Sequence, residues 1–140
     1  MTRNTDLRLT ELDAARLERT LIDQLKRSPP EEQGTAELEA LLDEAAIVPS
    51  VAIDPQVVTM NSTVVLEEVP SAHRMTVTLV YPDDSDPELS RISVLSPVGR
   101  ALIGARIGEV VNVAIPGNPA RELRLTELQY QPEAAGHFDL

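Results

Sequence analysis

The spacing of apolar residues divides the chain into a helical first third and a strand-rich remainder. Leucine recurs every fourth residue at Leu17, Leu21 and Leu25, which predicts an amphipathic helix from about Thr10 to Arg27. The prolines of Ser28–Pro30 end this pattern, because proline cannot continue the hydrogen-bond ladder of a helix. The apolar stripe of the predicted helix consists of Leu12, Ala14, Leu17, Leu21, Ile22 and Leu25.

A second, shorter helix is predicted from Thr35 to Ile47. Thr35 is a suitable N-cap, and Pro49 lies beyond the end of the helix. At 1.5 Å per residue the two helices would be about 27 and about 20 Å long, and helices joined by a short loop normally pack antiparallel. We therefore predict a short, coiled-coil-like helical hairpin over residues 1–49, with residues 1–9 only loosely extended. Its tip would be formed by Ser28, Pro29, Pro30, Glu31 and Glu32.

After a predicted linker from Val48 to Pro55, the apolar spacing changes to a period of two, which indicates strands. Ser96 and Pro97 begin a short helix, and Gly104 can end it in a left-handed conformation. We predict an α+β domain over residues 50–140, in which one short helix packs on an antiparallel sheet of about five strands. The predicted strands are Thr63–Val69, His73–Tyr81, a short one from Ile92, Val110–Ile115 and Arg121–Tyr130, with a bulge near Leu128.

The charge of the chain narrows its possible partners. The formal net charge is −11 over 140 residues, and both the helical part and the strand-rich part are acidic. Such a surface does not suit tight, sequence-independent binding of nucleic acid and fits a basic protein surface better. The absence of cysteine excludes thiolate metal sites and cysteine catalysis. No apolar run approaches the roughly 20 residues of a membrane span, so we expect a cytoplasmic protein without a membrane partner.

Few residues have the type and spacing that suggest metal binding or catalysis. Glu31 and Glu32 are weak candidates for a magnesium site, because hard cations prefer oxygen ligands, but adjacent carboxylates need not converge on one ion. Asp83, Asp84 and Asp86 lack the spacing of a calcium loop, and we expect solvated turn residues or contacts for a basic patch of a partner. The two histidines lie in no metal or nucleophile motif. The sequence therefore predicts no catalytic residue, no metal and no cofactor.

Several motifs resemble a known protein family. Ser96-Pro-x-Gly-x-Ala-Leu-x-Gly104, followed by Ile107-Gly-Glu109, is similar to the C-terminal domain of the bacterial transcript cleavage factors GreA and GreB. Val58–Ser62, Leu79–Pro82 and Tyr130–Gly136 resemble the Rnk family, the regulators of nucleoside diphosphate kinase. The resemblance covers the strand-rich part of the chain and implies an FKBP-like fold for it.

The resemblance also implies a function. It points to a non-enzymatic regulator that binds RNA polymerase near the secondary channel and competes there with GreA-like factors. In those factors a much longer hairpin carries acidic tip residues that help to hold a catalytic magnesium, and this chain does not reproduce the tip motif. The chain also has too few aromatic residues to line a prolyl isomerase pocket. The residues expected to contact polymerase are Asp83, Asp84, Asp86, Ser96, Pro97, Gly99, Arg100 and Arg106.

Two other functions stay open at this point. The chain could regulate nucleoside diphosphate kinase, directly or through gene expression, as the family name states. It could instead be a transcript cleavage factor that uses Glu31 and Glu32. The tail Tyr130–Gly136 also has two interpretations, since it could fold back over a sheet edge or present a surface to a partner.

Overall fold

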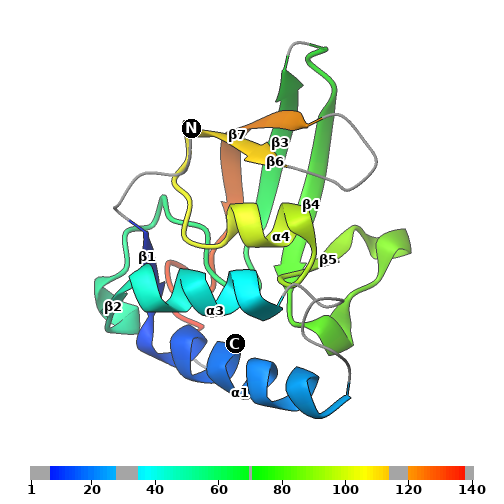
Figure 1. The fold of residues 1–140 in the computed structure, drawn as a ribbon. Coiled ribbons are helices and arrows are strands. Elements are labelled where there is room, and N and C mark those ends of the chain that lie inside the picture. The colour runs from blue at the N-terminus through cyan, green and yellow to red at the C-terminus, as the bar shows by residue number, and fades with distance from the viewer. Residues whose placement is uncertain (1–6, 28–34, 70, 114–119, 138–140) are drawn as a thin grey trace.

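The computed structural model describes residues 7–27, 35–69, 71–113 and 120–137 and shows a mixed α+β fold, as predicted (Figure 1). The predicted hairpin tip and the last two residues of the predicted strand Val110–Ile115 lie outside the described residues. In chain order the elements are β1 (Arg8–Thr10), α1 (Glu11–Arg27), α3 (Thr35–Glu44), β2 (Ala46–Val48), the 3-10 helix η1 (Ser50–Ala52), β3 (Thr63–Val69), β4 (Arg74–Val80), the 3-10 helices η2 (Pro82–Asp84) and η3 (Pro87–Leu89), β5 (Arg91–Ser93), α4 (Pro97–Leu102), β6 (Val110–Val113) and β7 (Arg121–Tyr130).

The larger sheet has five strands in the order β5-β4-β3-β7-β6. The β3–β4, β3–β7 and β6–β7 pairs are antiparallel, whereas β5 runs parallel to β4, with Thr78 opposite Arg91. The prediction of a wholly antiparallel sheet is therefore wrong at this edge. The cause is the connection between β4 and β5, which contains η2 and η3 in place of a tight hairpin. This longer connection carries the chain back along the sheet, so that β5 runs in the same direction as β4.

Helix α4 carries the chain across the sheet from β5 at one edge to β6 at the other (Figure 1). The Ser96 side chain accepts a hydrogen bond from the Gly99 N–H at 3.1 Å, and Pro97 occupies the first turn, as predicted. Gly99 is buried where a Cβ atom would collide with the Ser93 carbonyl oxygen, so the helix can lie close to β5. Gly104 has a φ of +79°, which confirms the predicted left-handed residue after the helix.

The helices α1 and α3 lie against each other beside one end of the sheet and run in opposite directions (Figure 1). Leu17 of α1 and Leu38 of α3 are fully buried in the same core as Leu66 and Leu125 of the sheet. Ile22 does not belong to the buried stripe, because its side chain is 54% exposed. Successive helical residues are rotated by about 100°, and the core takes the face that carries Leu17.

Strand β1 precedes this helix pair and β2 follows it, and the two strands pair in parallel as a separate two-stranded sheet. Leu7 and Leu9 are buried, so the prediction of a loosely extended start is wrong for these residues, and α3 ends at Glu44, before the predicted Ile47. Leu7 packs against Gly104, which has no Cβ and leaves space for the leucine side chain. The β-branched pair Ile47–Val48 favours a strand over a further helical turn.

The segment predicted as a linker, Val48–Pro55, is also structured. It begins in β2 and continues into η1, after which Ile53 is buried. Asp54 then accepts a hydrogen bond from the Gln56 N–H at 2.8 Å, which closes a tight turn before β3. The helical and strand-rich parts are thus joined by ordered chain.

The pairing of β3 with β7 contains two irregularities. The register shifts between Thr63 and Val64, which pair with Tyr130 and Leu128 respectively, and shifts again two residues later. This confirms the bulge predicted near Leu128 and lets the long strand β7 curl across the sheet.

Candidate partner-binding site

The residues at the start of α4 have structural roles of their own. Ser96 caps the helix and also donates a hydrogen bond to the Ser93 carbonyl oxygen at 2.7 Å. Gly99 is buried, and the Arg100 guanidinium donates a hydrogen bond to the Leu95 carbonyl oxygen. Pro97 and Arg100 are partly exposed, so they can contribute contacts, whereas Gly99 can act only by bringing α4 close to the sheet.

The predicted acidic residues lie in the two 3-10 helices beside β5. Asp83 and Asp84 are exposed in η2, and Asp86 caps η3 by accepting a hydrogen bond from the Glu88 N–H at 3.1 Å. Both 3-10 helices contact β5, and β5 leads directly into the α4 cap. The structure therefore brings the acidic residues and the start of α4 to the same edge of the sheet.

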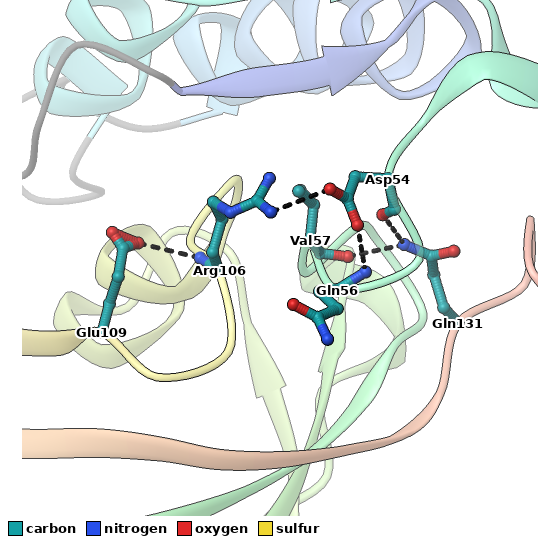
Figure 2. Close-up of polar contacts among 6 residues, drawn as sticks. All are labelled: Asp54, Gln56, Val57, Arg106, Glu109 and Gln131. Carbon is teal, nitrogen blue, oxygen red and sulfur yellow. Dashed lines mark hydrogen bonds and ion pairs between the residues drawn. The ribbon is translucent and has the colours of Figure 1, made fainter.

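Arg106 lies apart from this edge, beyond the opposite end of α4 (Figure 2). Its guanidinium forms an ion pair with Asp54 at 2.8 Å, and its backbone N–H donates to the Glu109 carboxylate at 2.8 Å. The hydrogen bond from the Gln56 N–H and the Arg106 guanidinium lower the pKa of Asp54 below its ordinary value. Arg106 thus holds a half-exposed ion pair, separate from the other predicted contacts.

Gln131 holds the segment after β7 against the loop before β3 by hydrogen bonds. Its side-chain amide donates to the Asp54 carbonyl oxygen at 2.9 Å and to the Val57 carbonyl oxygen at 2.7 Å (Figure 2). Glu133 is buried and accepts a hydrogen bond from the Thr59 hydroxyl at 2.7 Å. The tail therefore folds back, as one of its two interpretations stated, but onto the loop before β3 and not over a sheet edge.

A buried carboxylate near the same loop was missed by the sequence analysis. Asp13 has no exposed surface, and its carboxylate accepts a hydrogen bond from the Met60 N–H at 3.0 Å and a longer one from the Tyr81 hydroxyl at 3.5 Å. Burial raises the pKa of Asp13 to about 7, and the negative charge of Glu133 adds to this effect. The signal in the sequence is position, because Asp13 precedes Leu17 by one helical turn and so lies on the apolar face.

The described part of the chain offers no evident metal site. Within residues 7–27, 35–69, 71–113 and 120–137, no group of three or more histidine, aspartate or glutamate side chains could hold an ion. Glu31 and Glu32, with the rest of the predicted tip, lie outside these residues. None of the described helices is both long enough and apolar enough to cross a membrane.

Comparison with known proteins places the strand-rich part in a family. The family described as "Transcription elongation factor, GreA/GreB, C-term" matches residues 53–130, which run from the turn at Asp54 to the end of β7. The chain belongs to the GreA/GreB family. The predicted contact residues from Asp83 to Arg106 all lie inside the matched region, whereas Asp13 and Glu133 lie outside it.

Individual relatives within the family carry two different names. A regulator of nucleoside diphosphate kinase from Escherichia coli K12 is 40% identical over 101 residues, which cover 72% of this chain and 74% of that protein. The transcription elongation factor GreA of Trichlorobacter lovleyi is 34% identical over 95 residues, covering 68% of this chain and 60% of that factor. The family resemblance inferred from the sequence motifs, GreA/GreB-like and within it Rnk-like, is thereby confirmed.

A solved structure agrees with the fold. A prokaryotic transcription elongation factor GreA/GreB from Nitrosomonas europaea superposes with a TM-score of 0.74 at 39% identity, covering 89% of this chain and 100% of that one. This GreA/GreB-like protein includes the helical part in its match, since 89% of the chain exceeds the strand-rich part alone. The relatives carry the names of regulators and factors.

Proposed function

We propose that this protein is a non-enzymatic transcription regulator that binds RNA polymerase near its secondary channel and competes there with GreA-like elongation factors. The observation that carries the proposal is the family match over residues 53–130, together with relatives named as transcription elongation factors. The strand-rich part of the chain would dock on polymerase, and its FKBP-like architecture is part of the same proposal.

The edge formed by η2, η3, β5 and the start of α4 is the proposed docking surface. Asp83 and Asp84 are exposed there, and Pro97 and Arg100 are partly exposed. Carboxylates at a rim steer a partner with a basic surface, while partly buried residues at the centre of an interface supply most of its affinity. Arg106 would form a second, peripheral contact, because its ion pair with Asp54 holds it beyond the far end of α4.

The helical part argues against cleavage as the main activity. At 1.5 Å per residue, the 17 residues of α1 span about 26 Å and the 10 residues of α3 about 15 Å. Leu17 and Leu38 are buried in the shared core, so part of this length packs against the sheet and does not project. We propose that residues 1–49 act as a short hairpin that points into the channel without completing a cleavage site.

Direct binding of the purified protein to core RNA polymerase tests the proposal. We expect saturable binding, weakened several-fold by Asp84→Asn or by Pro97→Ala, and unchanged by the control Asp43→Asn, which removes an exposed carboxylate from α3. The absence of binding well above micromolar concentration would contradict the proposal. Robust transcript cleavage by the unmodified protein, lost in the variant with Glu31→Ala and Glu32→Ala, would favour the cleavage function instead.

Regulation of nucleoside diphosphate kinase is the second candidate. The specific observation in its favour is the 40% identity to a protein of that name. A direct effect requires that the purified protein bind the purified kinase or change its rate. If polymerase is bound and the kinase is not, any effect on the kinase passes through gene expression.

A further inference from the structure

The loop of residues 57–62, just before β3, contacts two buried carboxylates that come from opposite ends of the chain. Asp13, in the first turn of α1, accepts a hydrogen bond from the Met60 N–H at 3.0 Å. Glu133, in the segment after β7, accepts one from the hydroxyl of Thr59, the neighbouring loop residue, at 2.7 Å. The side chains of Asp13 and Glu133 are both buried. Two acidic groups are therefore enclosed against adjacent residues of a single loop.

Hydrogen bonds within the loop orient the donor that Glu133 receives. The Ser62 N–H donates to the Thr59 carbonyl oxygen at 3.2 Å, and Asn61 has a φ of +66°, so residues 59–62 form a tight turn. The hydroxyl oxygens of Thr59 and Ser62 are 2.9 Å apart. Because the Thr59 hydroxyl gives its one proton to Glu133, the Ser62 hydroxyl donates to Thr59. This chain of donors ends on Glu133 and suits an ionised carboxylate, which can only accept.

The segment that carries Glu133 is compact. We call residues 131–137 the clasp. The Ala135 N–H donates to the Gln131 carbonyl oxygen at 3.1 Å. The Gly136 N–H donates to the Glu133 carbonyl oxygen, also at 3.1 Å. Two buried side chains attach the clasp to the chain before β3, namely Glu133 and Gln131, whose amide donates to two backbone carbonyl oxygens there (Figure 2).

The groups around Asp13 act on its carboxyl in opposite directions. Burial raises the pKa of Asp13 to about 7, and the charge of Glu133 raises this pKa by more than the charge of Arg16, in the same helix, lowers it. The uncharged Thr10 of β1 lowers the pKa of Asp13 by a hydrogen bond. Tyr81, at the end of β4, has a pKa raised by burial, so its hydroxyl stays a neutral donor. The proton on Asp13 is therefore favoured while Glu133 is in place.

Coupling of this kind acts in both directions. Charges enclosed in the same region repel each other more strongly than in water, because the interior screens them less. If the attached clasp raises the affinity of Asp13 for a proton, the proton favours the attached clasp by the same factor. With the clasp attached, the pKa of Asp13 is about 7, and it is lower once Glu133 has moved away. Attachment of the clasp thus takes up a proton and weakens as the pH rises through about 7.

We infer that attachment of the clasp to the loop of residues 57–62 is coupled to protonation of Asp13, so that the clasp opens more readily when Asp13 is ionised. The same loop binds α1 through Asp13, and opening of the clasp therefore also loosens the contact between α1 and the loop. The family match over residues 53–130 contains the loop but neither Asp13 nor Glu133. The inference goes beyond the proposed function and does not depend on polymerase as the partner.

The pKa of Asp13, followed by the carboxyl ¹³C shifts of the labelled protein as the pH is changed, tests the coupling. Glu133→Gln removes the charge and keeps an acceptor for the Thr59 hydroxyl. We expect it to lower the pKa of Asp13 by about one unit. Glu127→Gln removes an exposed carboxylate of β7 and should leave this pKa unchanged. An unchanged pKa in the Glu133 variant, or an equal decrease in both variants, would overturn the inference.

Hydrogen exchange of the Ala135 and Gly136 amides reports opening of the clasp, because so short a segment does not keep its backbone hydrogen bonds once it is released. After correction for the intrinsic effect of pH on exchange, we expect protection to fall about fivefold between about pH 6 and pH 8, as a difference of one pKa unit requires. Asp13→Asn should abolish this pH dependence. A purely structural role would change protection equally at all pH values. Constant protection in the unmodified protein, or the same pH dependence in the Asp13 variant, would overturn the inference.

Discussion

Asp13 shows how one residue can link the stability of the chain to pH. The carboxylate is fully buried, and it accepts hydrogen bonds from the Met60 N–H and from the more distant Tyr81 hydroxyl. Its pKa is about 7 in the folded chain, against an ordinary value of 3.8. Between these values the folded chain retains a proton that the unfolded chain releases, so stability decreases as pH rises.

We predict that the free energy of unfolding falls between about pH 4 and pH 7 and then levels off as far as Asp13 is concerned. A difference of about three pKa units corresponds to about 4 kcal/mol. Asp13→Asn should remove this part of the slope, because the amide keeps an acceptor for the Met60 N–H without a titrating group. Urea unfolding at several pH values measures it, with the exposed Asp43→Asn as control. An unchanged slope in the Asp13 variant would show that other groups cause it.

Gly104 is the residue against which Leu7 packs, so it lies where the first described residues contact the strand-rich part. It has a φ of +79°, and an added Cβ would collide with the Leu7 side chain. Gly136 offers a matched control, since its φ is +82° and no atom lies within 4 Å of the position of an added Cβ.

Gly104→Ala should therefore destabilise the protein by about 2–3 kcal/mol or more, and Gly136→Ala by only about 1 kcal/mol, which is the cost of the left-handed conformation alone. Thermal or urea unfolding measures both values. Truncation of Leu7 to alanine should reduce the additional cost at Gly104, because it removes the colliding atoms. Equal effects of the two glycine substitutions would mean that Leu7 does not occupy this space.

At the scale of elements, the C-terminal tail is held by side-chain hydrogen bonds and not by regular pairing. Gln131 satisfies two carbonyl oxygens of the loop before β3, and one of them belongs to the buried Val57. Gln129, two residues earlier, is exposed in β7. Substitutions at Gln131 and at Gln129 can therefore be compared, which separates the loss of the tail's attachment from the loss of any glutamine side chain.

We predict that Gln131→Ala destabilises the fold by about 1–3 kcal/mol, because it leaves the Val57 carbonyl oxygen buried without its donor. Gln129→Ala should cost no more than about 0.5 kcal/mol. Denaturant unfolding measures both, and hydrogen exchange of residues 54–62 should increase only in the Gln131 variant. Comparable stability losses in the two variants would argue that the tail bonds contribute little.

Elements with a local signal could be predicted from the sequence, and elements that depend on distant contacts could not. The leucine spacing indicated α1, Ser96 and Gly104 bounded the region of α4, and Leu128 marked the bulge in β7. The parallel β1-β2 pair has no such signal, because its two short strands are separated by the whole helix pair, and the adjacent Leu7 packs against the distant Gly104. The parallel placement of β5 likewise follows from the path of η2 and η3.

The candidate site could be predicted only in part, for the same reason. The motif from Ser96 to Gly104 located the start of α4, but Gly99 within it is buried and serves packing. Asp13 lies in the first turn of the helix predicted from Thr10, and only the tertiary structure shows that its carboxylate accepts a hydrogen bond from the Met60 N–H.

For the whole molecule, charge and family membership point to the same kind of partner. A net charge of −11 disfavours direct binding to nucleic acid and favours a partner protein with a basic surface. The relatives that share the strand-rich part include transcription elongation factors. Association steered by such charges should weaken as the salt concentration rises above physiological levels, where the screening length falls below about 8 Å.

Competition for core RNA polymerase tests the central claim most directly. Purified polymerase is loaded with a fluorescently labelled GreA-like factor, and the unlabelled protein is added while the anisotropy of the label is followed. A shared site predicts saturable displacement, and the concentration of unlabelled protein needed for half-displacement should increase as the concentration of the labelled factor is raised. Binding of both proteins at once, or no displacement at concentrations far above micromolar, would contradict a shared site near the secondary channel.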